Sequence, residues 1–235
     1  MPGTLYLVPN LLGIVAPADV LPARTMAVAR TLRHWAVESP KPARAFLKSL
    51  ELAQPIASLD IQTLPKAADA AVLSALLAPA RDGSDVGLLS DAGCPGVADP
   101  GAALVAAAHD ARIRVVPLVG PSSLLLALMA SGMNGQSFAF HGYLPVAASE
   151  RAAALRRLED ESRVERRAQL FIETPYRNEA MLKTVSEALR PGTRVVVAAD
   201  LTLPTESIER RTAAQWRSAD TARYAKRPAI FILEA

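Results

Sequence analysis

Short apolar runs of β-strand character alternate along this chain with longer segments of helical periodicity. Residues 23–35 and 67–77 repeat apolar side chains at intervals of three and four, which is typical of amphipathic helices, and residues 101–111 follow an Asp-Pro-Gly signal for the start of a helix. Because neighbouring parallel strands need a crossover helix, the alternation predicts an α/β fold with mixed, largely parallel sheets. The predicted strands are residues 4–8, 86–90, 113–117, 168–173, 194–200 and 229–234.

The predicted sheets fall into two lobes. The chain has 235 residues, half of them apolar, which is enough for one large domain or two of modest size. The strand ending at Pro117 runs into Gly120 and Pro121, and the balance of charge shifts at the same place. We therefore expect an N-terminal α/β domain over residues 1–118 and a C-terminal α/β domain over residues 119–235.

Two glycine- and proline-rich loops follow strand-like runs. They are SDAGCPGVADPG, residues 90–101, and the end of VVPLVGPSS, residues 115–123. Small residues let a backbone approach a ligand closely, and unpaired amides can hold its polar ends. The sequence thus predicts one ligand-binding crevice where these loops meet.

Several functional classes lose support. The chain has no GxxxxGK[ST] phosphate loop, no GxGxxG after its first strand and no GxSxG serine elbow. Its single cysteine, Cys94, and three widely separated histidines argue against a metal site. No apolar run reaches the roughly 18 residues that span a bilayer, and the first residues lack a secretory signal pattern, so we expect a cytoplasmic protein.

Seven segments, in order and covering almost the whole chain, resemble the tetrapyrrole methylase superfamily, the class III S-adenosylmethionine-dependent methyltransferases. Within it the chain is similar to relatives of ribosomal RNA small subunit methyltransferase I. The segments are TLYLVP at 4–9, SDAGCPGVADPG at 90–101, VVPLVGPSSLLLALMASGM at 115–133, FAFHGYLP at 138–145, FIETPYR at 171–177, AADLTLPTESI at 198–208 and RPAIFILEA at 227–235.

The resemblance implies S-adenosylmethionine as cofactor, held by strand-end loops in a cleft between the two lobes. It also implies a homodimer and no metal. Backbone amides, a carboxylate and hydroxyls suit the methionine end of the cofactor, and an apolar wall suits its adenine. The implied cofactor-binding residues are Pro9, Asp91, Ala92, Gly93, Val97, Ala98, Asp99, Gly120, Ser122, Ser123, Ile172, Glu173 and Thr174.

Polar residues that we expect to point at the cleft are the candidates for contacting the methyl acceptor. Glu38, Lys41, Tyr176 and Arg177 are the candidate catalytic residues. Candidate substrate-binding residues are Arg44, His141, Arg210 and Arg211. The last two belong to a basic segment, residues 208–228, that suits an RNA backbone such as ribosomal RNA or the small ribosomal subunit.

The acceptor side also departs from the ribosomal enzymes. Where they carry Ala-Glu-Asp-Thr-Arg, this chain has AVESPK at residues 36–41, which keeps Glu38 and loses the Asp and Arg. Three functions therefore stay open: 2′-O-ribose methylation of a cytidine in ribosomal RNA, methylation of a tetrapyrrole or other small molecule, and non-catalytic binding of S-adenosylmethionine.

Individual residues also have purely structural explanations. Asp91 and Asp99 suit tight turns or a helix cap, and Ser122 suits a cap. Cys94 suits a small filler, and His141 a structural histidine within a strand. The basic segment equally suits a solvated face. The order of the seven segments, rather than any one residue, favours the functional interpretation.

Overall fold

The computed structural model describes residues 2–235 and divides into two compact units. The N-terminal unit ends at Ser122, and the C-terminal unit is Ser123–Ala235. That the chain has two domains with a boundary at residues 118/119 stays a prediction. Within the described residues, none of the helices combines the length and apolarity needed to cross a bilayer.

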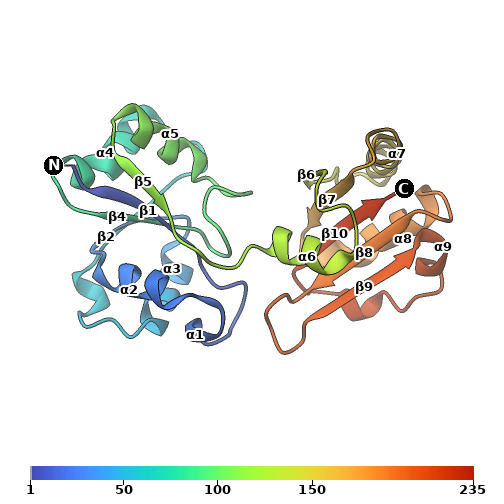
Figure 1. Ribbon diagram of the computed structural model, residues 1–235, viewed down its shortest axis with the longest axis horizontal. Helices are drawn as coiled ribbons and strands as arrows, with labels where there is room; N and C mark the ends of the chain where they lie inside the picture. The colour runs from blue at the N-terminus through green and yellow to red at the C-terminus, as the bar shows by residue number, and fades with distance from the viewer. Residues whose placement is uncertain (1) are drawn as a thin grey trace. The chain divides into compact units, whose positions relative to one another are not determined.

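The N-terminal unit is built on a five-stranded sheet in which every pair of neighbours is parallel. The strand order is β3-β2-β4-β1-β5 (Figure 1). The strands are β1 Thr4–Val8, β2 His34–Val37, β3 Asp60–Thr63, β4 Val86–Leu89 and β5 Arg114–Pro117.

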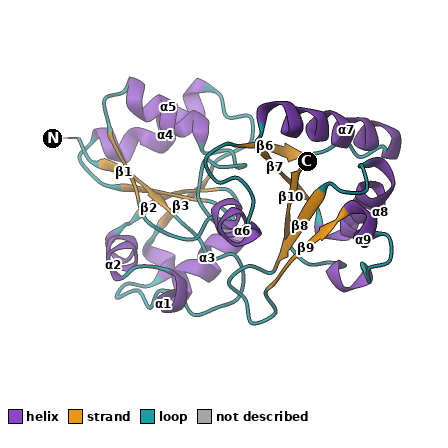
Figure 2. Cartoon of the chain, turned by 45° about the vertical axis from the view of Figure 1, so that its right-hand side comes forward, coloured by secondary structure: helices purple, strands orange, loops and turns teal. Residues whose placement is uncertain are grey.

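Helices cover both faces of this sheet (Figure 2). On one face Leu47 of α3 and Ala29 of α2 pack against Val37 and Leu89, and on the other Leu77 of α4 and Leu104 of α5 pack against Leu88. Two buried cores therefore sandwich the strands, as expected when a parallel sheet is closed off by crossover helices. The helical elements are α1 Pro17–Val20, α2 Ala23–Thr31, α3 Pro40–Ser49, η1 Ile56–Ser58, α4 Ala70–Arg81 and α5 Ala102–Asp110.

The connections place a crevice at the carboxyl ends of β1 and β4, which are neighbours. The chain leaving β1 runs to α2 on one face, whereas the chain leaving β4 runs to α5 on the other. Loops that diverge in this way open a gap outside the strand ends, which is where open parallel sheets bind ligands.

The C-terminal unit has a second five-stranded sheet, of order β6-β7-β10-β8-β9. The pair β6 and β7 is parallel and the other neighbours are antiparallel. Residues of α7, α8 and α9 form a core on one face with Phe171 and Phe231, and α6 packs against strands β8, β9 and β10. The elements are α6 Ser123–Ser131, β6 Phe138–Tyr143, α7 Ala148–Glu165, β7 Ala168–Glu173, η2 Pro175–Arg177, α8 Asn178–Ala188, β8 Arg194–Ala199, β9 Ser207–Thr212, α9 Ala213–Trp216, η3 Ala222–Tyr224 and β10 Ala229–Glu234.

The α/β fold with two sheets is confirmed, and two details differ from the sequence prediction. The parallel character belongs to the first sheet, because β10 runs back between β7 and β8 and makes the second sheet mixed. The helix expected over residues 23–35 ends at Thr31, and β2 follows from His34. Trp35 of that strand pairs with Gly87 and is 2% exposed, so packing in the sheet overrides the helical periodicity.

Candidate functional site

Asn10 ties together the loops that follow β1 and β4. Its side-chain Nδ2 donates to the carbonyl oxygens of Ser90 and Asp91, each at 3.0 Å, and its Oδ1 accepts from the amide of Leu11. The Asn10 amide also donates to the carbonyl of Gly93 at 2.9 Å. Asn10 is buried, so these bonds fix the position of the start of the SDAGCPG loop relative to the end of β1.

The loops that follow β2 and β4 are also linked. Glu38 Oε2 accepts a hydrogen bond from the Asp91 amide at 3.2 Å, and the Glu38 amide donates to the carbonyl of Leu89. Ser39 Oγ donates to Asp91 Oδ2 at 2.8 Å. The structure thus brings Glu38, a candidate catalytic residue, next to Asp91, a candidate cofactor-binding residue, at the same edge.

The loop after β4 has an unusual backbone. Gly93, Gly96 and Ala98 all have positive φ, of +67°, +82° and +63°. Glycine adopts this conformation at no steric cost, whereas alanine does so with strain that tends to mark functional loops. Val97 beside them is an exposed hydrophobic side chain. The loop thus presents backbone and a small apolar surface to solvent.

The close approach of Gly120 to Pro9 joins the loops after β1 and β5. A Cβ atom on Gly120 would lie 2.4 Å from Cβ of Pro9 and 2.6 Å from its Cγ. Thr25 Oγ1 donates to the neighbouring carbonyl of Val119 at 2.7 Å. Only glycine fits here without a shift of the backbone. The candidate residues Ser122 and Ser123 follow after Pro121, and Ser123 is the first residue of α6.

Asp99 has an unusual carboxyl group. Burial and the nearby negative charge of Glu38 raise the pKa of Asp99 to about 6, while the Ser90 hydroxyl and the Lys66 ammonium oppose the rise. Burial, followed by the charge of Asp99, also raises the pKa of the Cys94 thiol. Cys94 therefore stays protonated near neutral pH, in agreement with a filling role, and its Sγ contacts the carbonyl of Pro121.

A hollow of about 330 Å³ opens beside this edge, between α3 and the loop after β1. Its volume is within the usual range of small-ligand sites. Ile14 on its rim is fully exposed. The lining residues are Asn10, Leu11, Leu12, Gly13, Ile14, Val15, Pro42, Ala45, Phe46, Ser49, Asp91 and Ala92.

In the C-terminal unit, the end of β7 carries a buried ion pair. The side chain of Glu173 is 0% exposed, and its Oε1 accepts from the Thr174 amide at 2.6 Å and from Arg177 Nε at 2.8 Å. Oε2 of the same carboxylate is buried and has no partner among the described residues. The ion pair of Arg177 with Glu173 therefore fixes the turn η2 to the end of β7. Tyr176, in the middle of this turn, projects outward and is 83% exposed.

The candidate acceptor residues of this unit are not gathered in one place. His141 lies on β6, where its Nε2 pairs with Gln169 Oε1 at 2.6 Å, whereas Arg210 and Arg211 lie on β9. These are the two opposite edge strands of the sheet. The structure thus separates His141 from the two arginines, which were expected to share a substrate.

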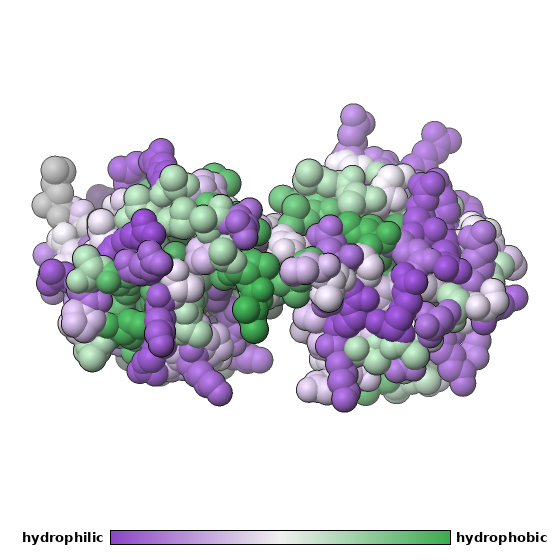
Figure 3. Space-filling model, turned by 90° about the horizontal axis from the view of Figure 1, so that it is seen from below, coloured by the Kyte–Doolittle hydropathy of each residue, from purple (hydrophilic) through white to green (hydrophobic). Residues whose placement is uncertain are grey.

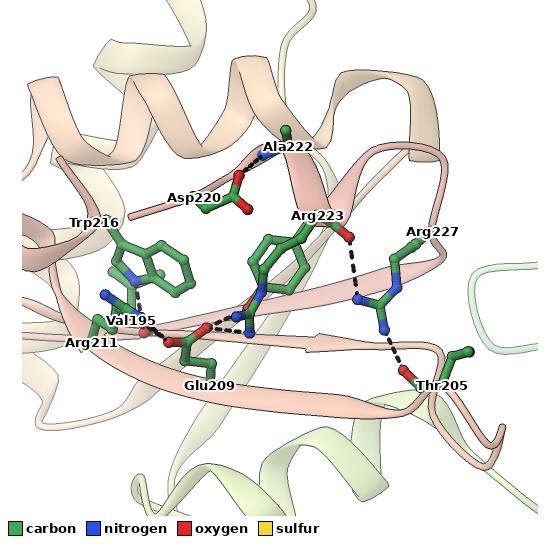
Figure 4. Close-up of polar contacts among 10 residues, drawn as sticks. Val195, Thr205, Glu209, Arg211, Trp216, Asp220, Ala222, Arg223 and Arg227 are labelled. Carbon is green, nitrogen blue, oxygen red and sulfur yellow. Dashed lines mark hydrogen bonds and ion pairs between the residues drawn. The ribbon is translucent and has the colours of Figure 1, made fainter. Parts of the chain in front are cut away.

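Part of the basic segment is ion-paired within its own unit (Figure 4). Glu209 accepts from Arg223 at 2.6 Å, from the Tyr224 hydroxyl at 2.7 Å and also from Arg211, whose guanidinium lies over the Trp216 ring. Although burial acts to raise the pKa of Glu209, the bonds from Tyr224 and Arg211 lower it. Burial and its bond to Glu209 raise the pKa of Tyr224 to about 12.

Further along the segment, Arg227 donates to Asp200 Oδ2 and Arg217 donates to the Ser186 carbonyl. Three of the six Lys and Arg side chains in residues 208–228, namely Arg211, Arg223 and Arg227, are therefore held in internal ion pairs.

Sequence reasoning missed Asn10, Ser39 and Glu209. Asn10 follows Pro9 at the end of the first strand, which was the available signal for a loop residue with a side-chain role. Ser39 and Glu209 act through contacts with residues 52 and 14 positions away, which no local pattern reveals.

Comparison with known proteins decides the family. The model of the Tetrapyrrole (Corrin/Porphyrin) Methylases matches residues 8–216. The chain belongs to this family. Ribosomal RNA small subunit methyltransferase I of Escherichia coli O157:H7 is 31% identical over 206 residues, which are 88% of this chain and 68% of that protein. The protein of the same name from Micromonospora olivasterospora is 36% identical over 187 residues, 80% of this chain and 56% of the relative.

Solved structures support the same fold. The methyltransferase CobJ superposes with a TM-score of 0.65 at 20% identity, covering 99% of this chain and 94% of the other. The cobalt precorrin-4 methyltransferase CbiF gives 0.64 at 14% identity, with 98% and 94% covered. At these identities the likeness concerns the fold alone.

As a member of this family, the chain is an S-adenosylmethionine-dependent methyltransferase. Gly93 and Gly96 fit such a cofactor, because both have positive φ and an added Cβ would meet no atom closer than 3.3 Å, so a ligand can approach their backbone closely. The individual cofactor-binding residues, and the cleft expected between the lobes, stay predictions.

Proposed function

We propose that this methyltransferase acts on the 2′-hydroxyl of a cytidine ribose in small-subunit ribosomal RNA. The observation that carries the proposal is the similarity over 88% of the chain to a protein named for ribosomal RNA methylation. We further propose that it works in the cytoplasm as a homodimer, as the family resemblance implies.

When bound, S-adenosylmethionine supplies a methyl group activated on a sulfonium, so the protein has mainly to position the acceptor and exclude water. In the N-terminal unit, the proposed cofactor contacts are Pro9, Asp91, Ala92, Gly93, Val97, Ala98, Asp99, Gly120 and Ser122. In the C-terminal unit they are Ser123, Ile172, Glu173 and Thr174.

The acceptor hydroxyl must lose its proton, and Glu38 is the proposed proton acceptor. Its carboxylate is held at the sheet edge by the Asp91 amide and lies close enough to Asp99 to raise the pKa of that group. Lys41 is the second residue of α3, three positions after Glu38, and its exposed ammonium can face a phosphate or the ribose oxygen.

Tyr176 and Arg177 have different proposed roles. Tyr176 is exposed and offers a ring on which a base can stack. Arg177 is engaged with Glu173, so it acts as a positioning residue that holds the turn beneath Tyr176.

The test is transfer of tritiated methyl from S-adenosylmethionine to undermethylated small ribosomal subunits. Free ribosomal RNA and a tetrapyrrole precursor serve as parallel acceptors, and labelled nucleosides are identified after digestion. Label in 2′-O-methylcytidine is the expected result. Label only in the tetrapyrrole, or cofactor binding without transfer to any acceptor, would overturn the proposal in favour of one of the two alternative functions.

A further inference from the structure

Three cations lie on one face of α3. Lys41, Arg44 and Lys48 are spaced by three and four residues, which places them in line along a helix, and all three are exposed. None of them has an acidic partner within 4.0 Å among residues 2–235. We call these residues the α3 stripe.

The stripe differs from the basic segment of the C-terminal unit. There, Arg211 and Arg223 share the carboxylate of Glu209, and Arg227 pairs with Asp200. The unpaired cations of that segment are spread over separate elements, with Arg210 on β9, Arg217 at the end of α9 and Lys226 after η3. A paired arginine must give up its carboxylate before it can neutralise a phosphate, whereas an unpaired one releases only solvent and counterions. Because its three unpaired cations lie in line on one helix, the α3 stripe is the more continuous electrostatic footprint for a polyanion.

The neighbouring face of α3 is apolar and lines the hollow described above. Pro42, Ala45 and Ser49 follow the same three-and-four spacing and face the loop that contains Leu12 and Ile14. Ile14 is fully exposed at the rim, so its side chain is free to contact a ligand that enters the hollow. One helix thus separates a row of positive charges from an apolar hollow.

Figure 3 looks at the side of the N-terminal unit on which α1, α2 and α3 lie in Figure 1. Hydrophilic side chains stand out from this surface next to apolar areas. That pairing suits a single-stranded nucleic acid, whose phosphates need cations and whose unstacked bases need an apolar surface.

We propose that the α3 stripe binds the phosphodiester backbone of the acceptor RNA and that the hollow beside it receives an unstacked base. The proposal rests on the proposed function, because it names the docking surface for the same RNA. It gives roles to Lys48 and to the loop at Ile14, and it moves the main RNA contact away from Arg210 and Arg211. The hollow begins at Asp91, so bound RNA would run toward Glu38 and the sheet edge.

The first experiment compares two variants that lose the same charge. Arg44→Gln with Lys48→Gln removes two stripe cations and leaves Lys41 in place. Arg156→Gln with Arg163→Gln removes two exposed, unpaired arginines from α7 as the control. RNA affinity is measured by fluorescence anisotropy over a range of salt concentrations, with a small-subunit RNA fragment and with anionic lipid vesicles as alternative ligand.

The stripe variant is expected to bind RNA about tenfold or more weakly near 0.1 M salt and to lose roughly 1.4 from the salt slope, the value for two single-strand phosphate contacts. The α7 control should bind as the wild type does. In methyl transfer, KM for RNA should rise while kcat is retained. Unchanged cofactor affinity will show that the variant is folded.

The hollow has its own matched pair. Ala45→Trp fills it from the exposed side of α3, and Ala27→Trp places the same side chain on the exposed side of α2. We expect Ala45→Trp to weaken RNA binding without changing the salt slope, because it removes a base contact and no phosphate contact. Ala27→Trp should have no effect.

The outcomes separate this inference from the proposed function. If the wild type methylates RNA and the stripe variant keeps its RNA affinity and salt slope, the docking surface is wrong and the function stands. If the wild type binds RNA through the stripe but labels no nucleoside, the docking surface stands and the function is wrong. Binding to vesicles and not to RNA would overturn the inference outright.

Discussion

Gly120 lies directly against the ring of Pro9, so that a single added methyl group would overlap the proline at 2.4 Å. The contact couples the loop after β5 to the loop after β1, and both loops carry candidate cofactor-binding residues. A proline ring cannot swing aside as a flexible side chain can, so the backbone itself must move when Gly120 is enlarged.

We therefore expect Gly120→Ala to reduce the affinity for S-adenosylmethionine at least tenfold in isothermal titration calorimetry and to lower Tm. Gly135→Ala is the control, because its added Cβ would meet nothing within 4 Å. Wild-type affinity in Gly120→Ala would mean that this contact does not position the cofactor.

Asn10→Ala should destabilise the N-terminal unit. The change leaves the carbonyls of Ser90 and Asp91 without the Nδ2 donor, at a buried position. The loss of a buried hydrogen-bond partner costs about 1–3 kcal/mol of the free energy of unfolding, measured by urea denaturation. Gln136→Ala, at an exposed position, should stay within about 0.5 kcal/mol of the wild type.

The sequence predicts the main architecture because its strongest signals are local. Strands such as β1 and β8 are mostly apolar runs, and helices such as α5 follow a start signal, here Asp99-Pro100-Gly101, so both are visible in the sequence. The strands β3 and β9 read DIQT and SIERRT and were not predicted. They are edge strands, which need fewer apolar side chains, so their sequences lack a strand signal.

The candidate site is predictable to a different degree. Glycine-rich loops can be recognised from the sequence alone. The structure places three of the predicted residues, Asp91, Gly93 and Glu38, at one sheet edge. Which arginines of the basic segment are ion-paired was not predictable, because the pairing depends on tertiary contacts of Glu209 with Arg211 and Arg223. Whether a cation is free or paired is decided by tertiary contacts that a charge count ignores.

Asp99 should give the stability of the protein a specific pH dependence. Its pKa is about 6 in the folded protein and near the ordinary value of 3.8 in the unfolded chain. Between these values the folded state binds more protons, so this group's contribution to stability is fully present below about pH 4 and is lost as the pH rises through 6.

We expect Asp99→Asn to be stabilised relative to the wild type more strongly at pH 7.5 than at pH 4.5, because asparagine carries no charge to bury. Thermal unfolding of both proteins at the two pH values measures the difference. Asp82→Asn, at an exposed position, is the control and should follow the wild-type profile. A constant difference between Asp99→Asn and the wild type would contradict the raised pKa.

Arg177→Met should be more harmful than the loss of both partners of its ion pair. The change leaves the Glu173 carboxylate buried, with a side chain that is 0% exposed and an Oε2 that already lacks a partner. An uncompensated buried charge costs about 3 kcal/mol or more of the free energy of unfolding. Adding Glu173→Gln removes that charge, so the double variant should recover much of the loss in urea denaturation. A double variant no more stable than Arg177→Met would show that Arg177 acts on the turn through packing rather than through the charge of Glu173.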